Sequence, residues 1–535
     1  MDSTTAANAP IGAIETVLLL FLAATALAIA ARRIGIPYPI LLVLGGLALG
    51  FVPGLPRIEL EPDIVFLLFL PPILFGAGYF TSIRDFKANL RAIGLLSIGL
   101  VLTTIVVVAV VAHAVIPGLG WPAAFALGAI VAPPDAVAAT AIFQRLGVPR
   151  RVVTILEGES LVNDATALVA YRFAIAAAMT GAFSLAQAGI SFVLVAAGGV
   201  ALGLLIGMAA AAILRRMDDP VFSVVLTFLF PVAAYLPAEI FGLSGVLSTV
   251  AAGIYLGRHA PRSMSSSVRI AGTSAWQVLL FLINGTVFIL IGVQLPTVLE
   301  NLGSRSPLEL VGLAVAISLT VILVRILWVF PGTYLPRRLS AGIRSREPQP
   351  APRNVFIVSW AGMRGVVSLA AALALPTTLP NGQPFPERDL LIFLTFAVIL
   401  ATLVGQGLTL PLVIRALGIA ADGGGGHEEL HARQAAAEAA VSRIEELAAQ
   451  WPGHLELIDA LRAQYGHRAS HDQHHDEAAT DEAEQELLEH RLIRGSVIEA
   501  EREALLRMRE TGGLSDDVFR KVERDLDLEE LRMEA

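Results

Sequence analysis

Long apolar stretches recur along most of this chain, and short connections rich in Arg separate many of them. A helix needs about 20 apolar residues to cross a bilayer. By this measure the pattern predicts an all-α fold, a polytopic membrane protein with about 13 transmembrane helices, some of them short or interrupted by Pro and Gly. We place the spans at residues 12–31, 38–53, 62–81, 91–116, 121–144, 155–179, 186–214, 219–237, 243–257, 272–295, 308–335, 354–377 and 388–415.

The composition excludes an ordinary soluble enzyme of this size. Of 535 residues, 55% are hydrophobic and only 16% are charged, against about 25% charged in typical soluble domains. Acidic residues are concentrated after Gly426, so the net charge of -8 describes the tail rather than the apolar part. Membrane lipid is therefore the expected partner, and nucleic acid is not. Because the chain has no cysteine, it can form no disulfide, thiolate nucleophile or Cys-ligated metal site.

Basic residues are distributed unevenly between the two alternating sets of connections. Eighteen Lys and Arg residues fall in one set, and only Arg57, Arg305 and Arg388 fall in the other. The positive-inside rule places the richer set in the cytoplasm. We therefore expect a multi-pass protein of the cell inner (plasma) membrane, with its N-terminus outside and its C-terminus in the cytoplasm.

An internal repeat is visible at two of the short spans. Gly-Ile-Pro at 35–37 and Gly-Leu-Ala-Leu-Gly at 46–50 recur 207 positions later as Gly-Leu-Ser at 242–244 and Gly-Ile-Tyr-Leu-Gly at 253–257. Chance is the alternative, because Gly is common in membrane helices. An offset of seven spans would invert the second copy, and inverted repeats with broken helices are typical of secondary transporters. The two repeats of six spans would cover about 12–180 and 219–415, with 186–214 as a connector helix.

The fifth span contains a helix break. Pro133 and Pro134 precede Asp135 in the middle of an apolar run, and Pro removes a backbone donor and frees carbonyls one turn back. Carbonyls without partners are tolerated at membrane depth only where they line protein or water. We therefore expect Asp135 at an unwound crossing point, beside free carbonyls suited to a small cation. By the repeat, the partner break contains Gly362 and Arg364, for which packing glycine and a snorkelling Arg are the structural alternative.

The sixth span carries carboxylates at membrane depth, where charge is costly and marks a function by default. Ser160 and Asp164 lie four residues apart and share a helix face, with Asn163 adjacent. Hydroxyl, carboxylate and amide oxygens are hard ligands, suited to Na⁺, Li⁺ or protons. With Asp135 these residues form the predicted cation and proton site, in which Asp135, Ser160 and Asp164 hold the metal ion and Asp164 carries the proton. A merely helix-bridging role for Asp164 is the alternative.

Glu159 points away from that face and needs its own partner. The best candidate is Arg325, in the middle of the eleventh span, because an unpaired buried Glu or Arg would each be strongly destabilising. We expect this pair to be a structural ion pair rather than a transport element. Glu157, nearer the helix start, either faces a cytoplasmic funnel or favours the positive helix N-terminus.

The segment Glu-Gly-Glu-Ser-Leu-Val-Asn-Asp at 157–164 resembles the sixth-helix motif of the monovalent cation:proton antiporters, the bacterial sodium/proton antiporters related to animal sodium/proton exchangers. Segments 70–75, 362–365 and 404–409 resemble three more motifs of that family, so the resemblance covers about 12–418. It implies thirteen helices, a core domain that moves against a dimerisation domain, and a homodimer.

The resemblance also implies roles for single residues. In this family an Asn before the essential Asp usually accompanies electroneutral one-for-one exchange. Where the family commonly has Thr-Asp-Pro, this chain has Pro-Asp-Ala at 134–136, and Gly-Ala-Gly at 76–78 stands where many members carry an acid. The implied ion ligands are Asp164, Asp135 and Ser160, the Asn before the Asp is Asn163, and the structural pair is Glu159 with Arg325.

Residues 421–535 differ from the rest of the chain. They are rich in Ala, Glu, Arg and Leu with helical periodicity at 435–450 and 487–510, which predicts a cytoplasmic helical regulatory tail behind a transmembrane antiporter domain of residues 1–420. A pH-sensing or metal-binding role for its histidines is one hypothesis, but we favour a solvated, disordered loop, because such polar runs rarely pack. The histidines concerned include His467, His471, His474 and His475.

Together these patterns favour a secondary active antiporter that exchanges Na⁺ or Li⁺ for H⁺ by alternating access, with electroneutral stoichiometry and a role in pH homeostasis. It would be no enzyme and would need no cofactor beyond the transported Na⁺ and H⁺. The nearest alternative is K⁺/H⁺ exchange, because oxygen ligands do not rank the two cations without distances. An intramembrane aspartyl protease with Asp135 and Asp164 as its dyad would lack the Gly-x-Gly-Asp motif, and a passive cation channel would lack coupled fluxes.

Overall fold

The chain divides into two compact units, residues 1–421 and 422–535, and we describe each by itself. The structure is a computed structural model. It describes residues 3–52, 64–181, 184–217, 219–302, 305–347, 349–419, 424–474, 496–505, 507–508, 522–523 and 525–530.

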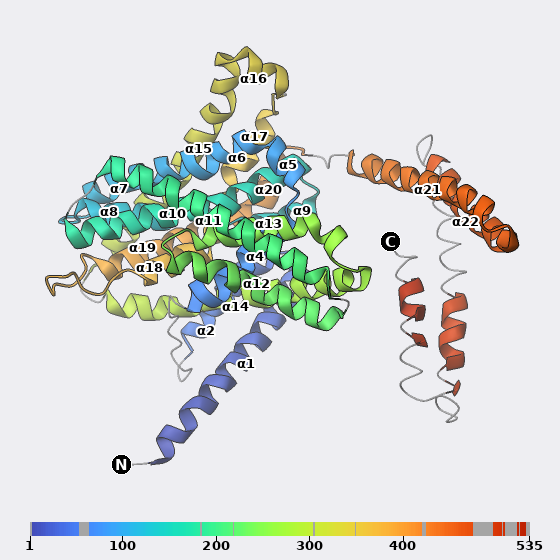
Figure 1. Cartoon of the computed structure of the whole chain (residues 1–535). Helices are drawn as coiled ribbons and strands as arrows, with labels where there is room; N and C mark the ends of the chain where they lie inside the picture. The colour runs from blue at the N-terminus through green and yellow to red at the C-terminus, as the bar shows by residue number, and fades with distance from the viewer. Residues whose placement is uncertain are drawn as a thin grey trace. The chain divides into compact units, whose positions relative to one another are not determined.

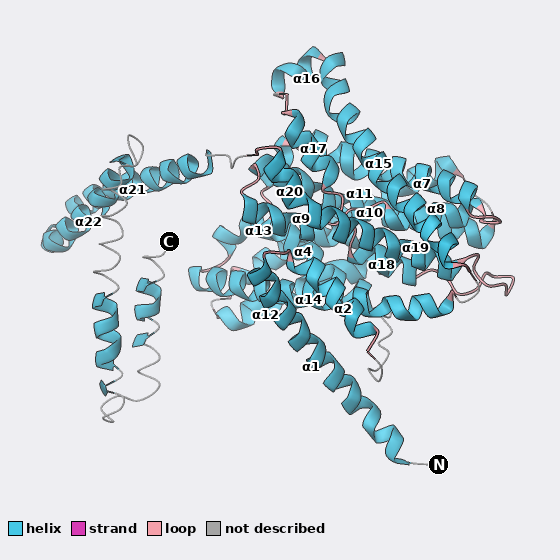
Figure 2. Ribbon diagram, turned by 180° about the vertical axis from the view of Figure 1, so that it is seen from behind, coloured by secondary structure: helices cyan, strands magenta, loops and turns pink. Residues whose placement is uncertain are grey.

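Helices joined by short connections make up most of the described residues of the first unit (Figures 1 and 2). An isolated bridge between Thr378 and Pro384 is the only extended pairing in that part of the chain, so the all-α prediction is confirmed. The elements are α1 (Ser3–Ile34), α2 (Tyr38–Gly50), η1 (Val65–Phe69), α4 (Leu70–Phe80), α5 (Ile83–Ala88), α6 (Leu90–Gly94), η2 (Leu95–Leu100), α7 (Val101–Val115), α8 (Trp121–Val131), α9 (Ala136–Leu146), α10 (Arg150–Thr180), α11 (Leu185–Leu214), α12 (Pro220–Ile240), α13 (Gly245–Ser263), α14 (Ser266–Asn301), α15 (Pro307–Leu339), α16 (Ala341–Arg346), α17 (Pro352–Trp360), α18 (Val366–Leu373), α19 (Arg388–Leu400), η3 (Ala401–Gln406) and α20 (Gly407–Ala416).

Within the described ranges, eight helices are long and apolar enough to cross a membrane, and two apolar helices are shorter. A multi-pass membrane protein is therefore confirmed, whereas the count of thirteen spans stays a prediction. The long helices are Leu90–Val115, Trp121–Phe143, Arg150–Thr180, Ala186–Leu214, Pro220–Ile240, Ser266–Glu300, Pro307–Leu339 and Arg388–Ala416, and the shorter ones are Tyr38–Gly50 and Val65–Phe80.

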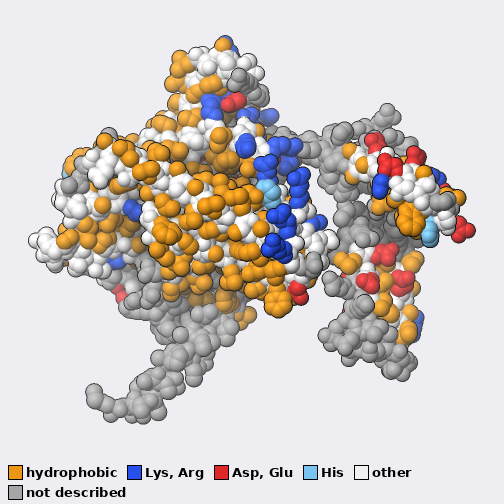
Figure 3. Space-filling view, in the orientation of Figure 1, with side chains coloured by type: hydrophobic (Ala, Val, Ile, Leu, Met, Phe, Trp, Pro, Cys, Tyr) orange, Lys and Arg blue, Asp and Glu red, His pale blue; other side chains and the backbone are white. Residues whose placement is uncertain are grey.

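The surface of this unit suits a lipid environment. Figure 3 shows apolar side chains spread over the visible face, with Lys and Arg gathered toward one edge. Helix α11 alone exposes Ile190, Val193 and Leu194 by more than 60% each. Large exposed apolar surfaces are rare on soluble monomers, so this face matches a helix bundle embedded in a bilayer.

Glycines of the two sequence copies make matching contacts inside the unit. A Cβ on Gly46 of α2 would lie 2.1 Å from the carbonyl oxygen of Ile289 in α14, and a Cβ on Gly253 of α13 would lie 2.5 Å from the carbonyl oxygen of Phe75 in α4. The lack of a side chain therefore lets each short helix pack backbone against backbone on its neighbour. The shared glycines of the repeat thus serve the same kind of helix contact in both copies.

The second unit begins with α21 (Gly424–Gln450), η4 (Pro452–His454) and α22 (Leu455–His474). Ala437, Ile444 and Ile458 are buried where these helices pack together. The helix predicted at 435–450 lies within α21. The histidine hypothesis falls outside the described residues, because His475 and the side chains of His467, His471 and His474 are not among them.

Candidate functional site

Two helices of the first unit are broken, and the breaks touch. Residues 132–135 separate α8 from α9, and residues 361–365 separate α17 from α18. The backbone N–H of Asp135 donates to the carbonyl of Met363 at 2.7 Å. The residues predicted at the breaks all lie in these two segments: Pro133, Pro134, Gly362 and Arg364.

Asp135 forms the start of the second half of its broken helix. Its Oδ1 accepts a hydrogen bond from the backbone N–H of Val137 at 2.9 Å, and so caps α9. A carboxylate at a helix N-terminus satisfies an orphan donor and meets the positive end of the helix dipole. The two prolines before it cannot donate a backbone hydrogen bond, which is why α8 ends there.

Arg364 donates hydrogen bonds to backbone carbonyls that the helix breaks leave without partners in their own helices. The residue is 1% exposed. Its Nε donates to the carbonyl of Val131 at 3.1 Å, its Nη2 to that of Ala132 at 3.4 Å, and its Nη1 to that of Gly362. A buried cation is favourable at this place because helix C-termini carry partial negative charge.

These contacts correct two expectations. The carbonyls of Val131 and Ala132 are not free for a small cation, because the guanidinium of Arg364 binds them. The snorkelling alternative for Arg364 is also wrong, because its head is enclosed by protein rather than extended toward a membrane surface.

Asn163 of α10 forms a hydrogen bond with the first break. Its Nδ2 donates to the carbonyl of Pro134 at 2.8 Å, and the residue is fully buried. Its Oδ1 has no hydrogen-bond partner among the described residues. Asn163 therefore holds α10 to the break and does not line the cavity described next.

The oxygen ligands predicted for the ion gather on one cavity. Asp135, Ser160 and Asp164 line a cavity of about 390 Å³, together with Pro133 and Pro134. Asp164 is 8% exposed, so its carboxylate is almost withdrawn from solvent. Two carboxylates and a hydroxyl can offer a small hard cation several oxygen ligands. Within the described residues no cluster of three His, Cys, Asp or Glu side chains forms.

The other walls of the cavity include both expected and unexpected residues. Glu157, for which the sequence left two positions possible, lines the cavity from α10, the helix of Asp164. Asn284 lines it from α14. Gly76 and Ala77 line it as well, so the part of the wall that these two residues form is apolar.

Two residues in or against the breaks, Gly365 and Thr402, were missed in the sequence. A Cβ on Gly365 would lie 1.9 Å from Oδ2 of Asp135, so only Gly leaves room for that carboxylate. Thr402 accepts the backbone N–H of Arg364 at 3.1 Å through Oγ1. Gly365 closes the Gly-Met-Arg-Gly segment and could have been singled out there, whereas nothing in the sequence distinguishes Thr402 from other polar residues of its helix.

Glu159 and Arg325 form a buried ion pair. Nη1 of Arg325 donates to Oε1 of Glu159 at 2.6 Å and Nη2 donates to Oε2 at 2.8 Å. The remaining Nε donates to the carbonyl of Val358 in α17 at 3.1 Å. A Cβ on Gly362 would lie 2.4 Å from Cδ of Arg325, so this glycine admits the arginine stem. The pair joins α10, α15 and α17 beside the break but does not line the cavity.

Comparison with known proteins points to one family. A family model described as "Sodium/hydrogen exchanger, transmembrane" matches residues 17–416. An uncharacterized Na(+)/H(+) exchanger of Mycobacterium tuberculosis is 36% identical over 502 residues, which are 92% of this chain and 91% of that protein. The sodium, potassium, lithium and rubidium/H(+) antiporter of Bacillus subtilis is 40% identical over 390 residues, which are 71% of this chain and 58% of that protein.

The fold has a counterpart among solved structures. The sodium proton antiporter MjNhaP1 from Methanocaldococcus jannaschii matches with a TM-score of 0.60 at 22% identity, over 77% of this chain and 98% of that one. At this identity the likeness concerns the fold alone.

Proposed function

Because the chain belongs to the sodium/hydrogen exchanger family, as the match over residues 17–416 establishes, we propose that it is a secondary active antiporter that exchanges Na⁺ or Li⁺ for H⁺ by alternating access. It is a transporter and not an enzyme, which removes the intramembrane protease from consideration. Coupled exchange also separates it from a passive channel.

One observation carries this proposal: Asp164, Asp135 and Ser160 line the same cavity beside the crossing of two broken helices. A carboxylate held away from water is costly to leave charged and alone. Either a proton or a cation bound by the neighbouring oxygens neutralises it, and the two ligands exclude each other. Competition of proton and cation for Asp164 is the chemical basis of antiport at this site.

The stoichiometry is proposed from the family resemblance, in which an Asn before the essential Asp accompanies electroneutral exchange. One cation replaces one proton at Asp164, so each cycle moves no net charge. Asn163 is a neutral neighbour that bonds to the break instead of titrating. Electroneutral one-for-one exchange is therefore the proposed mode, and a transport rate independent of a valinomycin-imposed membrane potential is the expected result.

Potassium is the second candidate cation. The Bacillus subtilis relative is named for sodium, potassium, lithium and rubidium, and two carboxylates with a hydroxyl do not by themselves exclude a larger ion. A panel of Li⁺, Na⁺, K⁺ and Rb⁺ in one proton-flux assay ranks these cations for this chain.

The remaining organisation is proposed from sequence. The resemblance supports a homodimer, the excess of basic residues in one set of connections supports an N-terminus outside and a C-terminus in the cytoplasm, and residues 421–535 would act as a regulatory tail behind an antiporter domain of residues 1–420. Cysteine labelling from each side of the membrane tests the orientation, since the chain has no cysteine of its own.

The function is tested with Asp164→Asn in proteoliposomes that hold a pH-sensitive dye. Removal of the titrating group should reduce cation-driven proton flux to background while the thermal midpoint changes little. Glu157→Gln is the matched control, because Glu157 is a carboxylate of the same helix on the same cavity, and it should keep most of the flux. Full activity of Asp164→Asn would overturn the proposal.

A further inference from the structure

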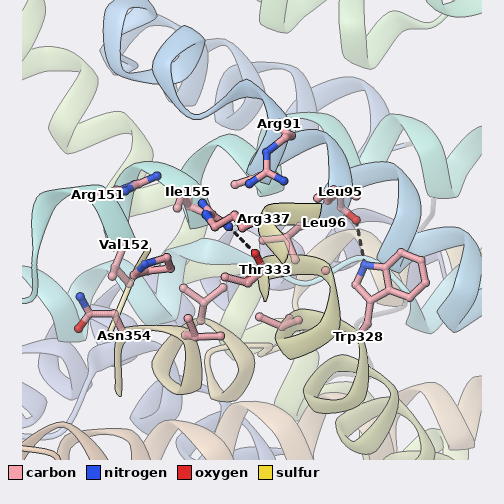
Figure 4. A pocket seen from close by; sticks show the side chains of 16 residues that line it. Arg91, Leu95, Leu96, Arg151, Val152, Ile155, Trp328, Thr333, Arg337 and Asn354 are labelled. Carbon is pink, nitrogen blue, oxygen red and sulfur yellow. Dashed lines mark hydrogen bonds between the residues drawn. The ribbon is translucent and has the colours of Figure 1, made fainter. Parts of the chain in front are cut away.

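A second pocket lies among α6, η2, α10, α15 and α17. It has a volume of about 80 Å³ and shares no lining residue with the cation cavity. Figure 4 shows the side chains of Arg91, Arg151 and Arg337 together near its upper part, with Val152 and Trp328 among the side chains around them. The pocket therefore combines cationic heads with an apolar wall.

Positive charge exceeds negative charge in the contacts of these arginines. Glu347 accepts from Nε of Arg91 at 2.9 Å, from its Nη2 at 2.6 Å, and from Nη2 of Arg337 at 2.7 Å. Arg151 donates from Nε to the neutral Asn89 Oδ1 at 3.0 Å. One carboxylate thus pairs with two of the three guanidinium groups, which leaves two of the three positive charges without a counter-charge in these contacts.

Two guanidinium donors of these arginines are buried without a hydrogen-bond acceptor among the described residues. Nε of Arg337 and Nη1 of Arg91 have no hydrogen-bond partner in the part of the chain that the structure describes, and Arg337 is only 7% exposed. Buried polar groups are satisfied in the great majority of cases, and a charged donor left without an acceptor is costly. The pocket is short of an anionic acceptor.

We propose that this pocket binds a phosphate group, carried either by the headgroup of an acidic phospholipid or by a free phosphate compound. A phosphate offers several acceptor oxygens and matches the planar donor fork of Arg. The apolar wall around Trp328 suits the acyl-chain side of a lipid. The connections that carry Arg91, Arg151 and Arg337 belong to the set that the positive-inside rule assigns to the cytoplasm, where anionic headgroups are abundant.

Binding would connect the helix that carries Asp164 to the helix that carries its structural neighbour Arg325. Arg91 lies on α6, Arg151 at the start of α10 and Arg337 at the end of α15, while α10 carries Asp164 and α15 carries Arg325. A single phosphate that bonds to all three arginines therefore holds these helix ends together and should stabilise the protein.

The experiment uses the purified full-length chain and two kinds of probe. Native mass spectrometry measures retention of phosphatidylglycerol against phosphatidylcholine, and thermal unfolding in lipid-free detergent measures the shift caused by inorganic phosphate against chloride at equal ionic strength. The variants are Arg337→Gln and, because that residue is buried and its change could prevent folding, the less buried Arg151→Gln. The matched control is Arg338→Gln, an exposed neighbour that does not line the pocket.

The outcomes separate the two sources. Retention of phosphatidylglycerol that falls about tenfold in Arg337→Gln and Arg151→Gln, but not in Arg338→Gln, identifies the lipid headgroup; a tenfold change is the effect of losing one charge-assisted hydrogen bond. A phosphate-specific thermal shift with the same dependence on the variants, without a lipid preference, identifies a free phosphate. Equal behaviour of the three variants toward both probes overturns the proposal.

Discussion

Arg325 faces the carboxylate of Glu159 with both terminal nitrogens, at 2.6 and 2.8 Å, and neither side chain is more than 1% exposed. This bidentate geometry joins α15 to α10 inside the bundle. The third donor of Arg325, Nε, bonds to the carbonyl of Val358 in α17. The pair is therefore the fixed point between the helix of Asp164 and the first half of one broken helix.

Removal of one partner should be strongly destabilising. Glu159→Gln or Arg325→Gln leaves a buried charge without its counter-ion, and the expected cost is about 3–5 kcal/mol, with part of it recovered in the double variant. The thermal midpoint of the purified protein measures the effect. The control is Arg172→Gln on α10, the helix of Glu159. It breaks a half-exposed pair with Glu239 and should cost less than about 1 kcal/mol. Equal midpoints for Arg325→Gln and Arg172→Gln would contradict this assignment.

Gly365→Ala should impair transport without unfolding the protein. The new Cβ would lie 1.9 Å from Oδ2 of Asp135, so the carboxylate must leave its place on the cavity. We expect at least a tenfold fall in proton flux with a midpoint close to that of the parent. Gly405→Ala is the control, since nothing lies within 4 Å of the Cβ it would add. Parent-like flux in Gly365→Ala would show that the position of Asp135 is not needed.

Asn163→Ala should loosen the first break. It removes the donor to the Pro134 carbonyl, and a buried carbonyl that loses its partner costs about 1–3 kcal/mol. The variant should unfold at lower temperature and show faster hydrogen exchange at the start of α9. Thr166→Val is the control, because among the described residues the hydroxyl of Thr166 bonds only to the carbonyl of Val162 in its own helix. If Thr166→Val lowered the unfolding temperature as much as Asn163→Ala, the hydrogen bond to the Pro134 carbonyl would have no special importance for stability.

Glu347 should make one part of the stability depend on pH. Its hydrogen bonds from Arg91 hold the pKa of Glu347 below its ordinary value of 4.5. Because the folded state favours the ionised form of Glu347, the stabilisation from its ion pairs is complete above about pH 4.5. It is lost as the pH falls further and the carboxylate becomes protonated. The midpoint difference between the parent and Glu347→Gln should therefore shrink from pH 7 toward pH 3. A difference that stays constant over this range would refute the ionic role of Glu347.

The ion pair and the helix breaks were readable in the sequence because each rests on a local or unavoidable cost. A Glu and an Arg in apolar spans must find each other, and Glu159 and Arg325 are in contact. Pro133 and Pro134 cannot continue a helix, and α8 ends just before them. Such predictions need no knowledge of how the helices are arranged.

The partners of the freed carbonyls were not readable. Arg364 reaches Val131 and Ala132 from another broken helix, a contact that depends on the tertiary crossing. Asn163 was placed with the cavity because it precedes Asp164, but consecutive residues on a helix point about 100° apart. It therefore faces the break at Pro134 while Asp164 faces the cavity.

The glycines that let α2 pack on α14 and α13 pack on α4 also limit how the protein can move. Sliding α2 along α14 by one turn, about 5.4 Å, in the direction that brings Leu42 in place of Gly46 would put a side chain at the carbonyl of Ile289, where a Cβ has only 2.1 Å of room. Each of these contacts therefore works as a pin against sliding of the two helices in that direction. Conformational change has to pass through interfaces that lack such pins, and the pinned pairs travel as rigid bodies.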